Sequence, residues 1–281
     1  MQVNLIDAAA SCPPVMLGGA FDGLSAKIVQ EVGFAGVWAS SFSISAAHGL
    51  PDIGLMGITD YFSVLADMRM AVSLPIVADC EAGLVPADQV HRVVKRFGLL
   101  GIDAIAIEDS KGPRASSLYD VPRRELEPTE VYASKIMAAK DASKEYGDGL
   151  RPLVFARTEA LVARQGVPEA LSRCRAYAAA GADAVIVQTN ERTPASLFAV
   201  SKEWDEGVPL VAVPTTYSDT PAAVLAANGY GILVYAHQAI RAAVSGMEAA
   251  LLTILREGRL AADASGQASI VQIARLTGTR E

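Results

Sequence analysis

The sequence has 281 residues, of which 51% are hydrophobic, 20% are charged and 6% are aromatic, and its formal net charge at pH 7 is −7. This apolar content is enough for one large core, and the excess of aliphatic over aromatic side chains is typical of strands buried on both faces. The acidic balance argues against a nucleic-acid partner, and the lack of Lys and Arg runs argues against an anionic membrane surface.

Eight short apolar runs recur along the chain, and each has the length and β-branched content of a buried parallel strand. Four of them begin with proline, which is tolerated as the first residue of a strand, at 14–19, 75–79, 152–157 and 209–214. The other four open with glycine, which fits the C-terminal cap of a preceding helix, at 33–40, 101–109, 181–188 and 229–237.

Helical patterns fill the gaps between these strands, at 25–32, 58–72, 87–97, 128–146, 167–180, 194–204, 219–228 and 238–257. Eight alternating strand–helix units predict a (β/α)8 TIM barrel of the α/β class. A doubly wound sheet is the rival architecture, but it would not usually need eight buried strands.

One more helical pattern, at 267–278, follows an exposed-looking linker. Its apolar positions, which include Ile270, Ile273 and Leu276, need a partner surface. We therefore expect a catalytic barrel domain over 1–258 and a C-terminal linker and helix over 259–281. This helix would close the bottom of the barrel or pack on a neighbouring subunit.

Cys12, Cys80 and Cys174 are odd in number and show no pair spacing. The first twelve residues contain an acid and no basic segment of the kind that opens a signal peptide. No stretch reaches the roughly 18–20 uninterrupted apolar residues that a membrane span needs. We therefore expect free thiols and a cytoplasmic protein with no membrane partner.

Acidic side chains follow two neighbouring strands, at the end where barrel enzymes hold their functional residues. Asp79 and Glu81 end the third strand and Glu108 ends the fourth, so their carboxylates would face one volume. Crowded carboxylates are costly unless a cation joins them, and oxygen-only ligands that also meet substrate oxygens favour Mg²⁺. Alternatively, these acids cap loops or pair with Arg157. That arginine, on the fifth strand, would grip a carboxylate or phosphoryl group, or form a structural ion pair with Glu159 or Glu108.

Other chemistries are disfavoured by what the strand ends lack. No strand ends on a lysine, which disfavours a Schiff-base aldolase. No glycine-rich loop follows the last two strands, which disfavours a phosphorylated sugar, and no GxGxxG motif opens a helix to indicate a dinucleotide. The histidines share no metal-ligand spacing, and His48 and His237 are open to a functional or a structural reading.

Five segments, DGLSAKIVQEVGFAGVWASSFSISAAHGLPD, ARTEAL, AYAAAGADAVIVQ, VPTTY and IRAAVSGM, resemble the isocitrate lyase/phosphoenolpyruvate mutase superfamily, and within it the branch of phosphoenolpyruvate mutase and phosphonopyruvate hydrolase. This resemblance spans nearly the whole chain. It implies a (β/α)8 barrel whose last helix is swapped between subunits, usually in a tetramer. It also implies Mg²⁺ held by Asp79, Glu81 and Glu108, although the family usually has an aspartate where this chain has Glu81.

The resemblance also implies roles for individual residues. Trp38 lies in the segment that is most similar to mutases. Ser40 and Ser41 match the turn that binds the substrate carboxylate, and Asp52 matches a residue near the metal and the substrate. Arg157 matches the arginine that holds the transferred group.

The segment after Glu108 resembles the gating loop that closes over the substrate in this family. In mutases, the sequence of this loop resembles E-D-K-x-F-P-K-x-N-S, whereas the loop of this chain reads E-D-S-K-G-P-R-A-S-S. Arg114 keeps the charge of a lysine, Ser117 is unchanged, and Ser116 replaces the asparagine that contacts the phosphoryl group in mutases. Gln188 likewise replaces a histidine that is typical of the phosphonate-handling branch.

The first functional hypothesis is a Mg²⁺-dependent enzyme that makes or breaks a carbon–phosphorus bond through a pyruvate enolate. Its substrate would be phosphoenolpyruvate, phosphonopyruvate or a related 2-oxo acid, and its assembly a homotetramer or a dimer of dimers. The expected catalytic residues are Asp52, Arg157, Arg114 and Ser116, and the expected substrate-binding residues are Trp38, Ser40, Ser41, Ser117 and Gln188.

The alternative is a C–C bond lyase or hydrolase acting on a 2-oxo or 2-hydroxy diacid, which the altered loop and Gln188 motivate. A third hypothesis is a catalytically inactive barrel that serves as a binding or scaffold protein. The acid cluster and Arg157 argue against this hypothesis.

Overall fold

The computed structural model describes residues 4–83, 89–111, 116–117, 124–145, 152–259 and 267–278. Its strands form a closed parallel barrel in chain order, and β8 pairs with β1 to complete the circle. The strands are β1 (Val15–Ala20), β2 (Gly36–Ala39), β3 (Ile76–Asp79), β4 (Ala104–Glu108), β5 (Leu153–Thr158), β6 (Ala184–Val187), β7 (Leu210–Ala212) and β8 (Tyr230–Tyr235). The predicted (β/α)8 barrel is confirmed, and the doubly wound sheet is excluded.

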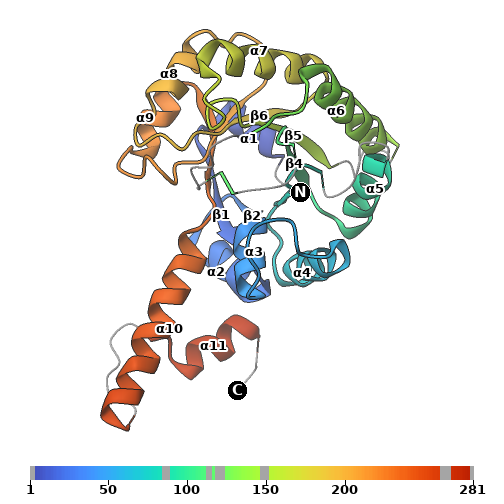
Figure 1. Ribbon diagram of the computed structural model, residues 1–281. Helices are drawn as coiled ribbons and strands as arrows, with labels where there is room; N and C mark the ends of the chain where they lie inside the picture. The colour runs from blue at the N-terminus through green and yellow to red at the C-terminus, as the bar shows by residue number, and fades with distance from the viewer. Residues whose placement is uncertain are drawn as a thin grey trace.

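Helices surround this barrel (Figure 1). They are α1 (Leu5–Ser11), α2 (Gly23–Val32), α3 (Ser41–Ala47), α4 (Ile58–Ala71), α5 (Val90–Leu100), α6 (Thr129–Lys144), α7 (Gly166–Ala179), α8 (Ala195–Lys202), α9 (Ala222–Ala227), α10 (Gln238–Glu257) and α11 (Ile270–Thr277). Gly33 and Gly101 end α2 and α5 in the left-handed conformation, with φ of 96° and 75°, as the sequence predicts. After each of these caps the chain enters the next strand, which runs parallel to the one before. The carboxyl ends of the strands therefore lie at the same end of the barrel.

Aliphatic side chains fill the inside of the barrel, and a second apolar layer lies between the strands and the helices. At the bottom of the barrel, Leu5 and Ala9 of α1 are buried with the interior cluster, so the N-terminal helix closes this end. The C-terminal helix α11 lies against α2 instead. There Lys27 Nζ donates to the carbonyl oxygen of Leu276 at 2.8 Å.

The long helix α10 projects away from the barrel (Figure 1). Ile240 is the buried residue of this helix, whereas Val244, Met247, Leu251 and Leu255 are exposed. Among the described helices, α10 alone is long and apolar enough to cross a bilayer, judged by length and composition only. This helix follows β8 of the barrel directly. Its exposed apolar side chains also fit a surface that binds another protein.

Candidate active site

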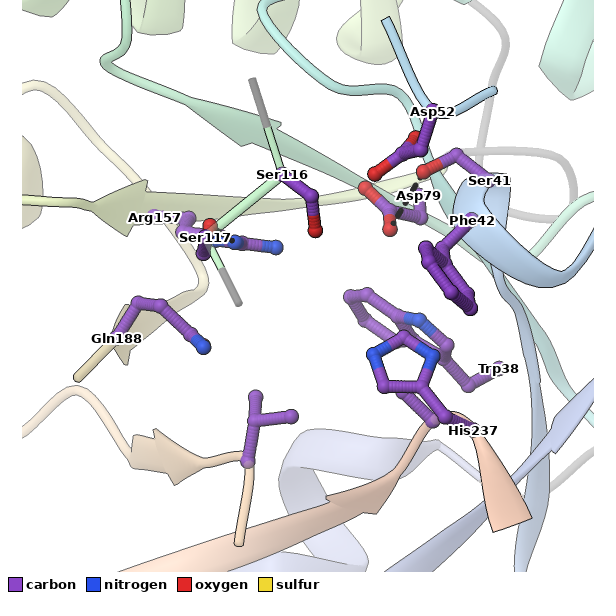
Figure 2. Close-up of a pocket in the computed structure, with 12 residues that line it drawn as sticks. Trp38, Ser41, Phe42, Asp52, Asp79, Ser116, Ser117, Arg157, Gln188 and His237 are labelled. Carbon is purple, nitrogen blue, oxygen red and sulfur yellow. Dashed lines mark hydrogen bonds between the residues drawn. The ribbon is translucent and has the colours of Figure 1, made fainter. Parts of the chain in front are cut away.

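A pocket opens at the carboxyl ends of the strands, where a parallel barrel holds its functional residues. Its wall consists of Trp38, Ser41, Phe42, Asp52, Asp79, Ser116, Ser117, Arg157, Gln188, Val213, Ala236 and His237 (Figure 2). The cavity is small, with a volume of about 30 Å³.

Most of the residues that the sequence singles out line this one pocket. They are Trp38, Ser41, Asp52, Asp79, Ser116, Ser117, Arg157 and Gln188. Ser40 lies just behind the wall, where its side chain caps α3 by accepting from the backbone N–H of Ser43 at 3.2 Å. Arg114 lies outside the described residues. Phe42, Val213 and Ala236 were not expected, and His237 was left open.

Asp79 is held at the end of β3 with its carboxylate in the pocket. Ser41 Oγ donates to Asp79 Oδ2 at 3.0 Å, and the backbone N–H of Glu81 donates to Oδ1 at 3.3 Å. Tyr61 fixes the backbone below, because its hydroxyl donates to the carbonyl oxygen of Asp79 at 2.7 Å. Asp52, from the segment after α3, points toward Asp79 from the neighbouring wall (Figure 2). Two buried carboxylates therefore face the same small space.

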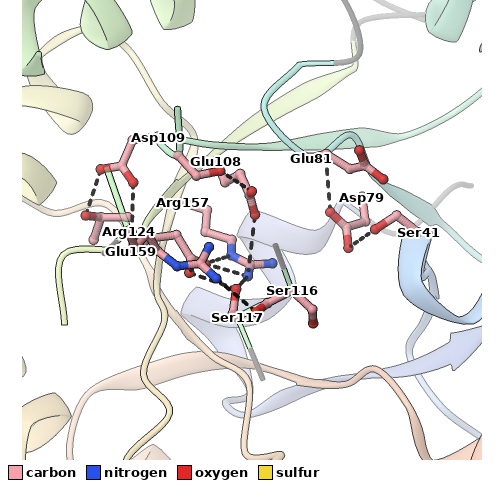
Figure 3. Close-up of polar contacts among 12 residues, drawn as sticks. Ser41, Asp79, Glu81, Glu108, Asp109, Ser116, Ser117, Arg124, Arg157 and Glu159 are labelled. Atoms are coloured by element: carbon pink, nitrogen blue, oxygen red, sulfur yellow. Dashed lines mark hydrogen bonds and ion pairs between the residues drawn. The ribbon is translucent and has the colours of Figure 1, made fainter. Parts of the chain in front are cut away.

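Of the three predicted metal ligands, the structure places Asp79 in the pocket wall and Glu81 and Glu108 outside it. Glu81 adopts a left-handed conformation with φ of 54°, which is strained for a residue other than glycine. Its side chain consequently lies near Gly54, turned away from Asp79 and Glu108 (Figure 3). Among the described residues, no three His, Cys, Asp or Glu side chains are arranged to hold a metal ion.

Glu108 is occupied by other partners. It accepts from the hydroxyl of Ser110, and its Oε2 lies 3.5 Å from Arg157 Nη2. Burial raises the pKa of Glu108 well above its ordinary value, although the charge of Arg157 opposes this shift. Of the predicted metal ligands, Asp79 alone lines the pocket, and Asp52 is the second acid there.

The donors that line the pocket fit a hard cation. Asp52 and Asp79 offer carboxylate oxygens, and Ser41 and Ser116 offer hydroxyl oxygens. Neighbouring carboxylates that are buried repel each other unless a cation or a proton joins them. A set made only of oxygen donors matches the preference of Mg²⁺. The pair Asp52 and Asp79 therefore fits this ion, and the roles of Glu81 and Glu108 as ligands stay predictions.

Arg157 faces these acids from the end of β5. Its Nη2 lies 2.5 Å from Glu159 Oε1 and donates to Ser117 Oγ at 2.6 Å. Burial lowers the pKa of Arg157, but the carboxylates of Glu159 and Glu108 outweigh this and raise it above its ordinary value. The guanidinium is therefore a permanent charge. It forms the structural ion pairs that the sequence left open, and it also lines the pocket.

Glu159 connects this arginine to the segment that contains Ser116 and Ser117 (Figure 3). Its buried carboxylate accepts from Ser117 Oγ at 2.7 Å and lies 3.3 Å from Arg124 Nη1. Arg124 also donates to the carbonyl oxygen of Ser116 at 2.9 Å. Sequence reasoning gave Glu159 only the role of a partner for Arg157. Their spacing of two residues, which puts both on one side of a strand, was the available signal, whereas nothing in the sequence indicates Arg124.

Asp109 ties the end of β4 to the end of β5 below the pocket. Its fully buried carboxylate accepts from Thr158 Oγ1 at 2.9 Å and from the backbone N–H of Glu159 at 2.8 Å. Tyr177 donates to it at 2.7 Å, and Arg173 lies 3.2 Å away. Burial raises the pKa of Asp109, whereas these hydrogen bonds lower it. This network fixes the two neighbouring strand ends that carry Glu108 and Arg157.

A further part of the wall carries neutral polar groups. Gln188 at the end of β6 is 4% exposed, and its Oε1 has no hydrogen-bond partner among the described residues. His237 at the end of β8 packs edge-on against Phe42, with ring centroids 4.8 Å apart. Burial lowers the pKa of His237 to about 4, although Asp79 opposes the shift. At neutral pH this wall therefore offers an amide and an uncharged imidazole.

Comparison with known proteins gives consistent matches. A sequence model of the phosphoenolpyruvate phosphomutase family matches residues 8–255. The chain is 36% identical over 256 residues to a phosphonopyruvate hydrolase of Variovorax sp. (strain Pal2), covering 91% of this chain and 87% of that protein. It is 34% identical over 262 residues to a phosphoenolpyruvate phosphomutase of Tetrahymena pyriformis, covering 93% and 86%. A crystal structure of phosphonopyruvate hydrolase in complex with oxalate and Mg²⁺ matches with a TM-score of 0.90 and 34% identity, covering 99% of this chain and 95% of that one.

Proposed function

Because this chain belongs to the phosphoenolpyruvate phosphomutase family, we propose that it is a Mg²⁺-dependent enzyme that makes or breaks a carbon–phosphorus bond in a small 2-oxo acid. Relatives named phosphonopyruvate hydrolase and phosphoenolpyruvate phosphomutase support a reaction of this class. The observation that carries the proposal is the opposition of two buried carboxylates, Asp52 and Asp79, to the guanidinium of Arg157 across one small pocket.

Asp79 and Asp52 are the residues that would hold the ion, with Ser41 beside them. When bound, Mg²⁺ would spread the negative charge that develops on the substrate as its enolate forms. The crystal complex of a related hydrolase with oxalate and Mg²⁺ supports the choice of ion. In its absence, the two carboxylates would repel an anionic substrate.

The chain's own groups would orient the substrate. The turn of Ser40 and Ser41, at the start of α3, would bind its carboxylate through hydroxyl and backbone N–H groups. Arg157 would hold the group that is transferred, because a guanidinium binds phosphoryl oxygens through two parallel hydrogen bonds. Ser117, which shares its hydroxyl with Arg157, and Ser116 would complete the contacts to that group. The predicted catalytic role of Arg114 stays a prediction, since it lies outside the described residues.

Cleavage of a C–C bond in a 2-oxo or 2-hydroxy diacid is a second candidate, and one observation favours it. Among the described residues, Arg157 is the only cation in the pocket wall, while Gln188 and His237 add neutral groups to the same wall. A phosphonate dianion is bound best by several cations. A carboxylate or hydroxyl fragment would be satisfied by an amide and an imidazole.

We also propose that the protein forms a homotetramer or a dimer of dimers, with its C-terminal helical segment packed on a neighbouring subunit. The exposed apolar side chains of α10 and α11 support this, because surfaces of this kind are usually covered by protein. Leu255 and Ile270, each 81% exposed, are the most exposed of them, followed by Leu251 and Val271 at 66%.

Phosphorus NMR with Mg²⁺ and phosphonopyruvate tests the function directly. Phosphoenolpyruvate as the product identifies a mutase, and inorganic phosphate together with pyruvate identifies a hydrolase. Unchanged phosphonopyruvate together with cleavage of an organic diacid would establish the second candidate. If nothing is turned over while oxalate still binds, the barrel is a binding protein and both candidates are wrong. Arg157→Met, with its charge removed, is the matched inactive control.

A further inference from the structure

His237 lines the pocket but has no role in the proposed carbon–phosphorus chemistry. It follows β8 directly, and its ring reaches into the pocket from the side opposite Asp52 and Asp79 (Figure 2). The end of β8 approaches β1 closely, because a Cβ on Gly19 would lie 2.1 Å from the carbonyl oxygen of Ala236. Glycine at that position therefore allows His237 to reach the wall.

The surroundings of His237 determine how its two ring nitrogens differ. Nδ1 lies 3.5 Å from Ser40 Oγ. Ser40 Oγ already accepts the backbone N–H of Ser43 at 3.2 Å, so its own proton is available to donate toward Nδ1. An acceptor role for Nδ1 places the ring proton of the neutral imidazole on Nε2. In Figure 2 this second nitrogen points into the pocket.

His237 does not have the helix-capping role that its place in the chain would suggest. It precedes α10, but within the described structure its side chain caps no backbone N–H of that helix. Its aromatic packing partner is Phe42, in an edge-on arrangement with ring centroids 4.8 Å apart. Burial keeps the imidazole uncharged at neutral pH. The pocket therefore contains an imidazole whose Nε2 can donate a hydrogen bond to a ligand.

We propose that His237 is a substrate-contacting residue whose Nε2–H donates a hydrogen bond to an oxygen of the bound 2-oxo acid, while Ser40 fixes its tautomer. This inference rests on the proposed function for the class of ligand. The metal side and Arg157 would bind the substrate from one wall, and His237 would bind it from the other. A neutral donor adds this contact without adding a charge that competes for Asp79.

The length of the replacement side chain distinguishes a ligand contact from a structural one. A glutamine at 237 places its amide nitrogen near the site of Nε2, whereas an asparagine places it near the site of Nδ1. We expect His237→Gln to bind oxalate, in the presence of Mg²⁺, within about threefold of the wild type. We expect His237→Asn and His237→Phe to bind it about 10- to 100-fold more weakly, as for the loss of a hydrogen bond to a charged group. Isothermal titration calorimetry measures these affinities, and His91→Asn on the exposed side of α5 is the matched control.

A purely structural role for His237, through its contact with Ser40, predicts the opposite order. His237→Asn would then bind oxalate better than His237→Gln, and that result overturns the inference. Equal binding by all three variants, or no binding of oxalate by the wild type, overturns it as well. Thermal melting of each variant shows whether it is folded. If one does not fold, the remaining glutamine or asparagine variant still reports whether the donor at Nε2 matters.

Nitrogen NMR of the histidine rings gives an independent reading. The chain has 3 histidines, so the signals that vanish in His237→Asn identify this ring. We expect a neutral ring protonated on Nε2, with a shifted proton when oxalate binds, and a ring protonated on Nδ1 contradicts the inference. If the wild type turns over neither phosphonates nor diacids while oxalate binding follows the expected order, the proposed function fails and the His237 contact stands. If it turns over phosphonopyruvate while the three variants bind oxalate equally, only this inference fails.

Discussion

Arg157 and Glu159 lie two residues apart at the end of β5 and form an ion pair, with Arg157 Nη2 2.5 Å from Glu159 Oε1. Glu159 is fully buried, and the side chain of Arg157 is 12% exposed, so the arginine alone reaches the pocket. The same carboxylate accepts from Ser117 Oγ. Glu159 therefore sets the direction of the anion-binding arginine and the place of Ser117 at once.

Glu159→Gln is expected to weaken catalysis without altering the shape of the site. Glutamine keeps an oxygen acceptor for Ser117 but leaves the buried charge of Arg157 without its main partner. We expect kcat/KM to fall about 10- to 100-fold, as for loss of a residue that orients a functional group. The free energy of unfolding should fall by about 3 kcal/mol, because one half of a buried ion pair remains. Steady-state kinetics and urea denaturation measure both, with Asp205→Asn, from an exposed pair with Arg175, as the control. Activity within threefold of the wild type would show that Glu159 does not orient Arg157.

Asp79→Asn is expected to remove metal binding. The asparagine oxygen still accepts from Ser41, but the negative charge that attracts Mg²⁺ is lost. We expect the affinity for Mg²⁺ or Mn²⁺ to fall at least about 100-fold and turnover to disappear. Calorimetry and electron paramagnetic resonance of bound Mn²⁺ provide the measurement, and Asp67→Asn on the exposed face of α4 is the control. Unchanged metal binding would eliminate the role of Asp79 as a ligand.

Gln188→Met should separate stability from activity. Oε1 of Gln188 is buried without a hydrogen-bond partner among the described residues, so the substitution removes a polar atom that lacks compensation. We expect the free energy of unfolding of the ligand-free protein to stay the same or rise by about 1 kcal/mol. The KM for the substrate should rise about tenfold, because the amide would contact it. A loss of stability would indicate that the amide has a structural partner instead.

The neutral state of His237 makes stability depend on pH. Its pKa in the folded protein is about 4, lowered by burial and by Arg157 and Arg241, although Asp79 raises it. The unfolded chain therefore binds more protons than the folded protein between about pH 6.5 and 4, and stability falls as the pH decreases through that range. Melting temperatures across this range should fall more steeply for the wild type than for His237→Gln. His91→Gln, at an exposed position, should follow the wild type, and parallel curves for all three proteins would contradict the depressed pKa.

Leu251→Glu on α10 should lower the oligomeric state. Leu251 is 66% exposed in the single chain, and a charged residue there would be costly to bury between subunits. Light scattering coupled to size exclusion should show smaller particles than the wild type gives. Leu99→Glu on α5, where the leucine is 69% exposed, is the matched control and should not change the mass. A wild-type monomer, or an oligomer that both variants retain, would contradict the role of α10 in assembly.

The barrel could be predicted from the sequence because the apolar runs and the glycine caps that indicate it are local and recur along the chain. The run predicted at 75–79 is observed as β3 at Ile76–Asp79, and Gly33 ends α2 as expected. The short helix α3 could not be predicted. Its residues Ser41 to Ser45 alternate polar and apolar, which is the pattern of a strand, and seven residues are too few to show a helical period.

The site was predictable where the barrel alone decides it. Asp79, Arg157 and Gln188 share a pocket because parallel strands end on one rim. The direction of Glu81 depends on a left-handed turn, which no side-chain pattern reveals. The position of Phe42 depends on α3, which the sequence did not show. A strand-end rule therefore finds the site, but it does not decide which neighbouring acid faces inward.

The last strand carries a consequence for synthesis. β1 gains its second neighbour only when β8 pairs with it, in the register Val15 with Ile232. On the ribosome, the edge of β1 thus stays uncovered until most of the chain has emerged, which leaves a surface that chaperones recognise. His237 leaves the exit tunnel just after β8. A chain that is terminated before this point therefore lacks both the closed barrel and the part of the pocket wall that His237 forms.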